Sequence, residues 1–155
     1  MTDTSQHADG ATPAPRPRIR KADHTIELTD PALATFWRER HLVTLTTPRA
    51  DGRPHVVPVG ATLDVENGLA RVITSGDSLK VKHIRRAGPQ GAAVALCQVD
   101  GRYWATIEGR ARILDSADEV AEAVRRYADR YGQPRENPKR VVVAVSITRV
   151  LGNLA

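Results

Sequence analysis

Three Asp-Gly or Asn-Gly pairs each lie between runs of residues that favour β-strands. Asp51-Gly52, Asn67-Gly68 and Asp100-Gly101 have the composition of tight turns, because these residue types accept the positive φ angles that short hairpin loops require. Strands joined by such turns run antiparallel. The spacing of these turns therefore predicts a sheet built largely from hairpins.

Runs of β-branched and apolar residues fill the intervals between the turns and predict six strands. Asp30 before Pro31, and Asp115 or Ser116, have the side chains of helix N-caps. The strands are expected at 42–49, 55–65, 69–75, 92–99, 102–114 and 141–151, and the helices at 29–41, 78–86 and 115–131. The expected fold class is mainly β with helices (α+β), as an antiparallel barrel or sandwich.

The N-terminal segment differs in composition from the rest of the 155-residue chain. Residues 1–27 are rich in Pro, Ala, Thr and charge and have few large apolar side chains. We therefore expect a flexible tail followed by one domain over residues 28–155. No apolar run is long enough to span a bilayer, and the tail lacks the apolar stretch of a secretory signal. We expect a cytoplasmic protein without a membrane partner.

The charge balance and the aromatic content limit the class of ligand. The chain has 23 Lys and Arg against 18 Asp and Glu, a net charge of +5, which favours an anionic ligand or nucleic acid. Aromatic residues form only 4% of the chain, which argues against the stacking platforms of proteins that bind single strands. A small anionic ligand is the expectation, and nucleic acid is the weaker alternative.

Common catalytic and metal-binding signatures are absent from the sequence. It contains no glycine-rich phosphate motif of the P-loop or dinucleotide-binding type, no H-E-x-x-H and no G-x-S-x-G. The five histidines are scattered and Cys97 is the single cysteine, so we expect no metal site and a buried, inert thiol. An enzyme of this kind would depend on a cofactor for its chemistry.

The segment TSGDSLKVKHIRR, residues 74–86, combines the features of a phosphate site. Thr74 and Ser78 offer hydroxyls, and Gly76 would let the backbone approach a ligand closely. The start of the predicted helix offers free N–H groups and a partial positive charge, and Lys80 adds a cation. The alternative is a capped, solvated basic helix without a ligand.

The segment PHVVPVG, residues 54–60, holds two prolines within a predicted strand. Pro54 and Pro58 cannot donate ladder hydrogen bonds, so this strand is expected at a sheet edge, at a bulge or at a kink. Its unpaired backbone groups would suit a planar heterocycle held between valine side chains. The alternative is a bent barrel strand without a ligand.

Four blocks of sequence, in this order, resemble the split β-barrel flavin and deazaflavin reductases of the pyridoxamine 5'-phosphate oxidase-like superfamily. They are RHLVTLTTPRADGRPHVVPVG, ARVITSGDSLK, QVDGRYWATIEGRA and RYGQPRENPKRVVVAVSITRVLG. The resemblance extends over residues 28–154 and is strongest for the branch that uses coenzyme F420. It implies a six-stranded antiparallel split β-barrel of the FMN-binding type, and a homodimer with two cofactor sites at the interface.

The resemblance also implies which residues would hold the cofactor, and it identifies no catalytic residue. The strand from His55 to Val59 would line the deazaflavin ring, and Arg85 would meet the cofactor's acidic tail. The implied cofactor-binding residues are His55, Val56, Val57, Pro58, Val59, Ile73, Thr74, Ser78, Leu79, Lys80 and Arg85, with Asp100, Gly101, Arg102 and Tyr103 reaching over from the other subunit.

The activity that the resemblance implies is hydride transfer from reduced coenzyme F420 to a planar conjugated acceptor, with a biliverdin-type tetrapyrrole as the first candidate. We expect Arg49, Arg53 and Lys139 to meet the acceptor's carboxylates. Two further alternatives are an FMN-dependent oxidase or reductase on the same fold, and a non-catalytic carrier of cofactor or tetrapyrrole.

Overall fold

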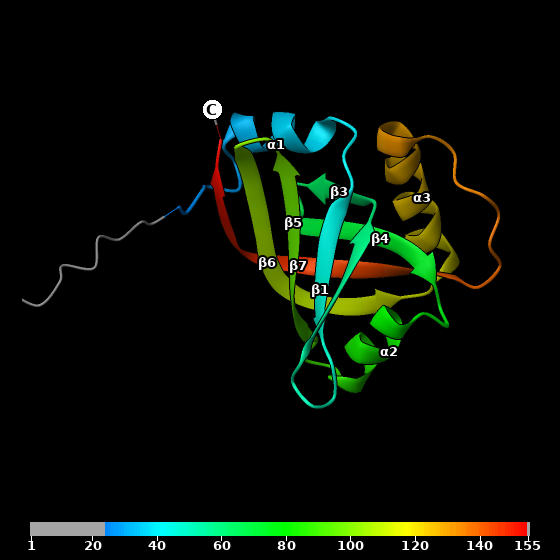
Figure 1. Ribbon diagram of the computed structural model, residues 1–155. Helices are drawn as coiled ribbons and strands as arrows, with labels where there is room; N and C mark the ends of the chain where they lie inside the picture. Colours follow the sequence, from blue (N-terminus) through cyan, green and yellow to red (C-terminus); the bar gives the residue numbers. More distant parts are fainter. Residues whose placement is uncertain (1–23, 155) are drawn as a thin grey trace, which may run out of the picture.

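A computed structural model describes residues 24–154, which form one seven-stranded sheet and three helices (Figure 1). None of the helices described there has the length and apolar character needed to cross a membrane. The elements in chain order are α1 (Pro31–Arg38), β1 (Val43–Pro48), β2 (Pro54–Val59), β3 (Ala61–Asp64), β4 (Leu69–Ser75), α2 (Leu79–Arg86), β5 (Ala92–Asp100), β6 (Tyr103–Leu114), α3 (Ala117–Tyr131) and β7 (Arg140–Asn153).

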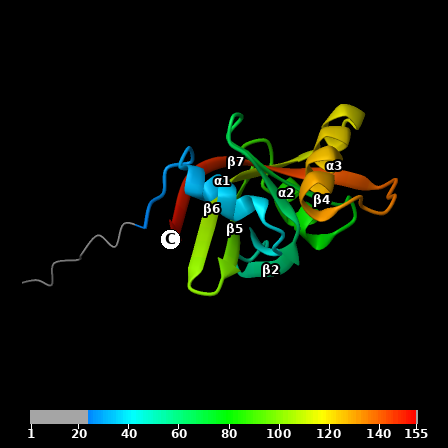
Figure 2. The same ribbon diagram turned by 90° about the horizontal axis from the view of Figure 1, so that it is seen from above.

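The strands are ordered β2-β1-β5-β6-β7-β4-β3, and each neighbouring pair is antiparallel. The sheet curls into a half-barrel, with α1 and α2 at its two ends and α3 beside β4 (Figures 1 and 2). Gly52, Gly68 and Gly101 have φ angles of 84°, 63° and 60°. The predicted α+β class and the three tight turns are therefore confirmed.

The predicted number of strands is wrong, because the run 55–65 forms two strands and the sheet has seven rather than six. β2 pairs with β1 at one edge of the sheet, whereas β3 pairs with β4 at the other. Gly60 separates the two strands, and a Cβ atom there would lie 2.8 Å from Cε2 of Tyr127. The chain passes close to α3 at this point, a contact that strand periodicity does not reveal.

All three predicted helices are present, and two of them begin at predicted caps. The Asp30 carboxylate accepts a hydrogen bond from the N–H of Ala32 at 2.9 Å, and Ser116 Oγ accepts one from the N–H of Glu119 at 3.3 Å. α2 follows Ser78, whose side chain makes no capping hydrogen bond. The Ser78 side chain therefore does not occupy the N–H groups of the first turn of α2.

The core lies inside the half-barrel and is built from alternate residues of the strands. Leu45, Leu96 and Ile107 are fully buried there. Cys97 is half-buried rather than buried, because it follows Leu96 on β5 and the two-residue period turns its side chain to the outer face of the sheet. The prediction of a buried thiol is therefore wrong.

The described chain begins with residues that pair with β7. The N–H of Ile26 donates to the carbonyl of Val150 at 2.9 Å, Thr25 bridges Leu151, and the Ile26 side chain packs against the core. Residues 24–26, which were predicted to be part of a flexible tail, are thus attached to β7 by backbone contacts. Residues 1–23 of that predicted tail lie outside the described residues.

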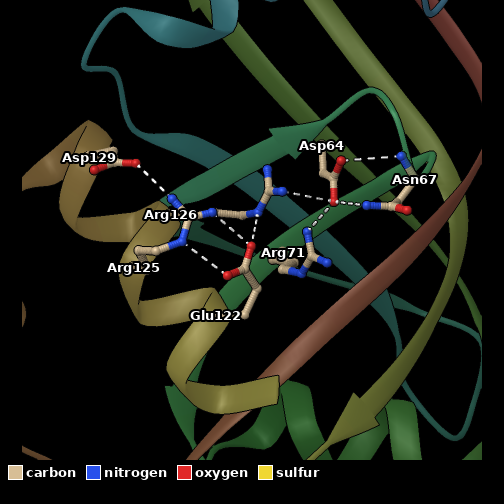
Figure 3. Close-up of polar contacts among 7 residues, drawn as sticks. All are labelled: Asp64, Asn67, Arg71, Glu122, Arg125, Arg126 and Asp129. Atoms are coloured by element: carbon tan, nitrogen blue, oxygen red, sulfur yellow. Dashed lines mark hydrogen bonds and ion pairs between the residues drawn. The ribbon is translucent and has the colours of Figure 1, made fainter. Parts of the chain in front are cut away.

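A buried carboxylate joins β3, β4 and α3 (Figure 3). Asp64 is 3% exposed, and its Oδ2 lies 2.8 Å from Nη1 of Arg71 and 3.3 Å from Nη2 of Arg126. Burial acts to raise the pKa of Asp64, but hydrogen bonds from Arg71 and Asn67 outweigh it and keep the pKa below its usual value. This cluster fixes α3 against the strands, and α3 in turn contributes one wall of the site described next.

Candidate functional site

A cavity of about 250 Å³ lies where the ends of β2 and β4 meet the start of α2. Five of the residues predicted to bind a cofactor line it together: Pro58, Val59, Ile73, Thr74 and Lys80. The structure therefore brings the two segments singled out in the sequence to one place. The other lining residues are Gly60, Ser75, Tyr127, Pro134, Asn137 and Arg140. We call this set the cradle.

The cradle is strongly cationic. Lys80 is half-buried, and this burial lowers the pKa of its ammonium group. Arg140 enters from β7, where its guanidinium donates to the carbonyl of Arg135. No carboxylate lies among the described residues that line the cavity. A bound anion would compensate these two cations, so the site has the charge of an anion-binding site.

Hydroxyl groups and the start of α2 supplement these cations. The Thr74 hydroxyl donates to Ser78 Oγ at 3.4 Å, and the N–H of Ser78 donates to the carbonyl of Ser75 at 3.1 Å. These contacts hold the end of β4 against the first turn of α2, whose N–H groups favour negative charge. Hydroxyls, free N–H groups and two cations together suit a phosphate.

Two tyrosines of α3 shape the other side of the cradle. Tyr131 donates through its hydroxyl to the carbonyl of His41 at 2.7 Å and accepts from the N–H of Ala61 at 3.1 Å. Tyr127 packs against Tyr131 with ring centroids 4.9 Å apart. Both rings lie close to Gly60, so the position of β2 relative to the cradle depends on α3.

Sequence reasoning missed the contributions of α3 and of the segment before β7. Tyr127, Asn137 and Arg140 all line the cradle, although none was predicted to bind a ligand. The sequence ENPKR, residues 136–140, carried a signal, because Asn-Pro followed by basic residues marks a polar loop at the start of a strand. Nothing in the sequence indicated that this loop returns to β4.

Gly76 has a different role from the one predicted. Its N–H donates to the carbonyl of Lys139 at 2.7 Å, and a Cβ atom at this position would lie 3.0 Å from the same oxygen. Gly76 therefore permits close approach of the protein's own backbone. Lys139 points its ammonium group toward Asp77, with Nζ and Oδ2 3.5 Å apart at the exposed surface.

The first half of β2 lies outside the cradle. The imidazoles of His55 and His83 are in edge contact at 4.9 Å, which joins β2 to α2. His83 is buried, and Thr47 Oγ1 lies 3.0 Å from its Nδ1. Burial, followed by the charges of nearby His55 and Arg groups, lowers the pKa of His83. Val56, by contrast, is 55% exposed on the outer face of the sheet.

The remaining predicted residues lie elsewhere on the surface. Arg53 pairs with Asp51 at 2.7 Å, and Arg85 lies 4.0 Å from Asp115. Arg102 donates to the hydroxyl of Tyr103 at 2.8 Å. The predicted residues that do not line the cradle are His55, Val56, Val57, Ser78, Leu79, Arg85, Asp100, Gly101, Arg102 and Tyr103 for the cofactor, and Arg49, Arg53 and Lys139 for the acceptor.

Comparison with known proteins identifies the family. Residues 29–153 match the family described as pyridoxamine 5'-phosphate oxidase. The chain belongs to this family. Within the pyridoxamine 5'-phosphate oxidase family, the chain is 51% identical over 129 residues to the F420H(2)-dependent biliverdin reductase of Mycobacterium tuberculosis. That alignment covers 83% of this chain and 90% of the reductase, so the resemblance seen in the sequence is confirmed.

Solved structures of other proteins share the fold. The conserved hypothetical protein Rv2991 of Mycobacterium tuberculosis superposes with a TM-score of 0.69 at 22% identity, covering 84% of this chain and 87% of that one. A protein described as an F420 reductase superposes with a TM-score of 0.59 at 23% identity, covering 75% and 93%. At these identities the similarity confirms the fold alone.

Proposed function

We propose that this protein is an F420H2-dependent oxidoreductase. The observation that carries the proposal is the 51% identity to a protein described as an F420H(2)-dependent biliverdin reductase, in an alignment that covers 90% of that protein. The cradle supports it independently, because it offers a half-buried lysine, an arginine and hydroxyls without an opposing carboxylate among its described lining residues. This chemistry fits the phosphodiester of coenzyme F420.

In this proposal the residues of the cradle divide the work of binding. Lys80 and Arg140 would hold the phosphate oxygens, with Thr74 as a hydroxyl donor. The strand His55–Val59 would line the ring, and the cationic end of α2 around Arg85 would meet the acidic tail. The cradle would fit the phosphate of FMN as well. Coenzyme F420 is favoured over FMN by the cations near Arg85, which suit its acidic tail, and by the cofactor in the relative's description.

When bound in its reduced form, the deazaflavin supplies a hydride from its C5 atom. The chain's own residues orient the bound groups and exclude water from them. Pro58 and Val59 provide an apolar wall beside the cationic pair. No side chain of the cradle is required as a nucleophile, which agrees with the lack of hydrolase motifs in the sequence.

We propose a biliverdin-type tetrapyrrole as the acceptor, on the basis of the relative's described activity. Its propionates require cations near the ring. Of the residues predicted for this role, Arg53 already pairs with Asp51 and Lys139 with Asp77. A propionate would have to compete with these carboxylates for the two cations. Arg49 precedes the turn between β1 and β2.

We also propose that the protein acts as a homodimer. Leu42 and Val99 are 70% and 61% exposed, and extending the register of β1 with β5 by two residues beyond the Thr44–Cys97 pair would place them near one another on the outer face of the sheet. Val99 pairs with Trp104 across β5 and β6. A second copy would cover this apolar patch and bring its turn Asp100–Tyr103 toward the cofactor.

A fluorescence titration of the purified protein with oxidised coenzyme F420, and with FMN in parallel, tests the proposed function. We expect micromolar or tighter binding of coenzyme F420, weaker binding of FMN, and oxidation of F420H2 when biliverdin is added. Tight binding of FMN without binding of coenzyme F420 would contradict the proposed cofactor. Binding of F420H2 without turnover of any conjugated acceptor would indicate a carrier.

A further inference from the structure

A second and larger cavity, of about 640 Å³, lies on the outer face of the sheet. It is bounded by the end of β1, the β1–β2 turn, the start of β5 and the middle of β6 and β7, and its volume is in the range typical of sites for small-molecule ligands. Its lining residues are Thr46, Thr47, Pro48, Gly52, Pro54, Ala93, Val94, Ala95, Glu108, Gly109, Arg110, Thr148 and Arg149. We call it the outer cavity.

One cross-strand row connects the outer cavity to the strand proposed to line the cofactor ring. Val56 pairs with Thr46, Thr46 with Ala95, Ala95 with Glu108, and Glu108 with Arg149. Directly paired residues present their side chains on the same face of an antiparallel sheet. Neighbouring strands are about 4.8 Å apart, so the row extends roughly 14 Å from Val56 to Glu108. This length suits an extended flat molecule.

The floor and the rim of the outer cavity differ in chemistry. Ala93 and Ala95 give β5 a strip of small apolar side chains between Thr46 and Glu108 of the neighbouring strands, and Pro54 adds an apolar edge from β2. Arg110 is an exposed residue opposite Ala93 in the register of β5 with β6, and its Nη1 donates to the carbonyl of Gly91 at 3.5 Å. The lining holds two arginines, Arg110 and Arg149, against one carboxylate, Glu108, so an apolar strip with a net positive rim suits a conjugated molecule that carries carboxylates.

β2 borders both cavities. Pro54 at its start lines the outer cavity, and Pro58 and Val59 at its end line the cradle. The start and the end of this strand are about 17 Å apart. A cofactor whose phosphate lies in the cradle and whose ring follows β2 would therefore extend toward the outer cavity.

We infer that the outer cavity is the binding site of the electron acceptor, and that Arg110 pairs with an acceptor carboxylate. This inference rests on the proposed function, in which the acceptor is an elongated planar molecule with carboxylate side groups, and adds to it the acceptor's binding site and the residue that pairs with its carboxylate. The apolar patch of Leu42, Val99 and Trp104 lies at the other end of the same face.

Equilibrium binding in the presence of saturating oxidised coenzyme F420, which cannot donate a hydride, tests the inference without turnover. Biliverdin is the probe, followed by its absorbance, and coenzyme F420 is titrated separately into each variant. We expect Arg110→Gln to weaken biliverdin binding about tenfold, the size expected for one lost charge-assisted contact. Ala95→Trp, which fills the half-exposed floor, should abolish it. Neither substitution should change the Kd for coenzyme F420.

Arg112→Gln is the matched control, because Arg112 is an exposed arginine two residues further along β6 that does not line the outer cavity. It should leave both affinities unchanged. Unchanged biliverdin binding in Arg110→Gln and Ala95→Trp, with normal binding of coenzyme F420, would overturn the inference and leave the proposed function standing. If the unmodified protein does not bind coenzyme F420, the proposed function is overturned instead. Binding of coenzyme F420 without any binding of biliverdin would overturn the class of acceptor.

Discussion

His83 couples the position of α2 to the protonation of one buried ring. It packs on His55 at 4.9 Å and lies 3.0 Å from Thr47 Oγ1. Its pKa is lowered from the ordinary value of 6.5 by burial first, and then by the charges of His55, Arg86 and Arg49. The folded protein therefore favours neutral His83, and this contribution to stability is complete above pH 6.5 and is lost as the pH falls through the lowered pKa.

We expect His83→Gln to reduce the acid sensitivity of the fold, since glutamine retains a polar group for Thr47 but takes up no proton. Thermal unfolding at pH 7.5 and at pH 5 measures this effect. The fall in Tm between the two values should be smaller in His83→Gln than in the unmodified protein. The exposed His24 provides the control His24→Gln, which should show the full fall. An equal fall in all three proteins would contradict this role of His83.

At the scale of elements, the break at Gly60 sets the path of β2 past the cradle. A methyl group at this position would lie 2.8 Å from Tyr127 and 3.2 Å from Tyr131. We expect Gly60→Ala to lower the free energy of unfolding by about 1–3 kcal/mol, because the tyrosines or β2 must move. Denaturant unfolding measures it. Tyr127→Leu in the same chain should recover part of the loss, and Gly60→Ala with unchanged stability would show that this contact is not tight.

The attachment of α3 to the sheet depends on Asp64. Asp64→Asn would leave Arg71, which is 7% exposed, without its buried carboxylate. We expect a loss of about 3–5 kcal/mol in the free energy of unfolding, since an unpaired buried charge is costly. Asp129→Asn is the control, because Asp129 makes an exposed ion pair with Arg125, and the loss in the free energy of unfolding should be under about 1 kcal/mol. Similar losses in both variants would contradict the account.

At the scale of the whole molecule, the sequence predicted the features that depend on local chemistry. The glycine turns at Gly52 and Gly101, the caps at Asp30 and Ser116, and the edge position of β2 all follow from backbone preferences. The contacts between segments that are far apart in the sequence were not predicted from these local features.

The split at Gly60 shows why. It depends on the packing of α3, and the cradle gains Tyr127 and Arg140 only because the chain after α3 returns beside β4. These contacts join residues far apart in the sequence, and periodicity within one segment carries no information about them. The family resemblance supplied the segments that meet at the cradle, but not these additional lining residues.

The exposed apolar side chains on the outer face of the sheet predict that the protein forms a dimer. We expect Val99→Asp to shift the protein from dimer to monomer, because it places a charge at the centre of the patch that a second copy would cover. Sedimentation velocity over a range of concentrations measures the shift. Thr35→Asp, at an exposed position of α1, should remain dimeric. A dimer of unchanged affinity in Val99→Asp would place the interface elsewhere.

The affinity of cradle variants for oxidised coenzyme F420 tests the central claim most directly. Lys80→Gln and Arg140→Gln each remove one cation that lines the cradle, whereas Lys82→Gln and Lys139→Gln remove neighbouring cations at the exposed surface. We predict that each cradle variant weakens binding about tenfold or more, and that the two neighbours have little effect. Equal weakening by all four would mean that the overall positive charge attracts the cofactor and would contradict the cradle. Unchanged binding in Lys80→Gln and Arg140→Gln would place the phosphate at another site.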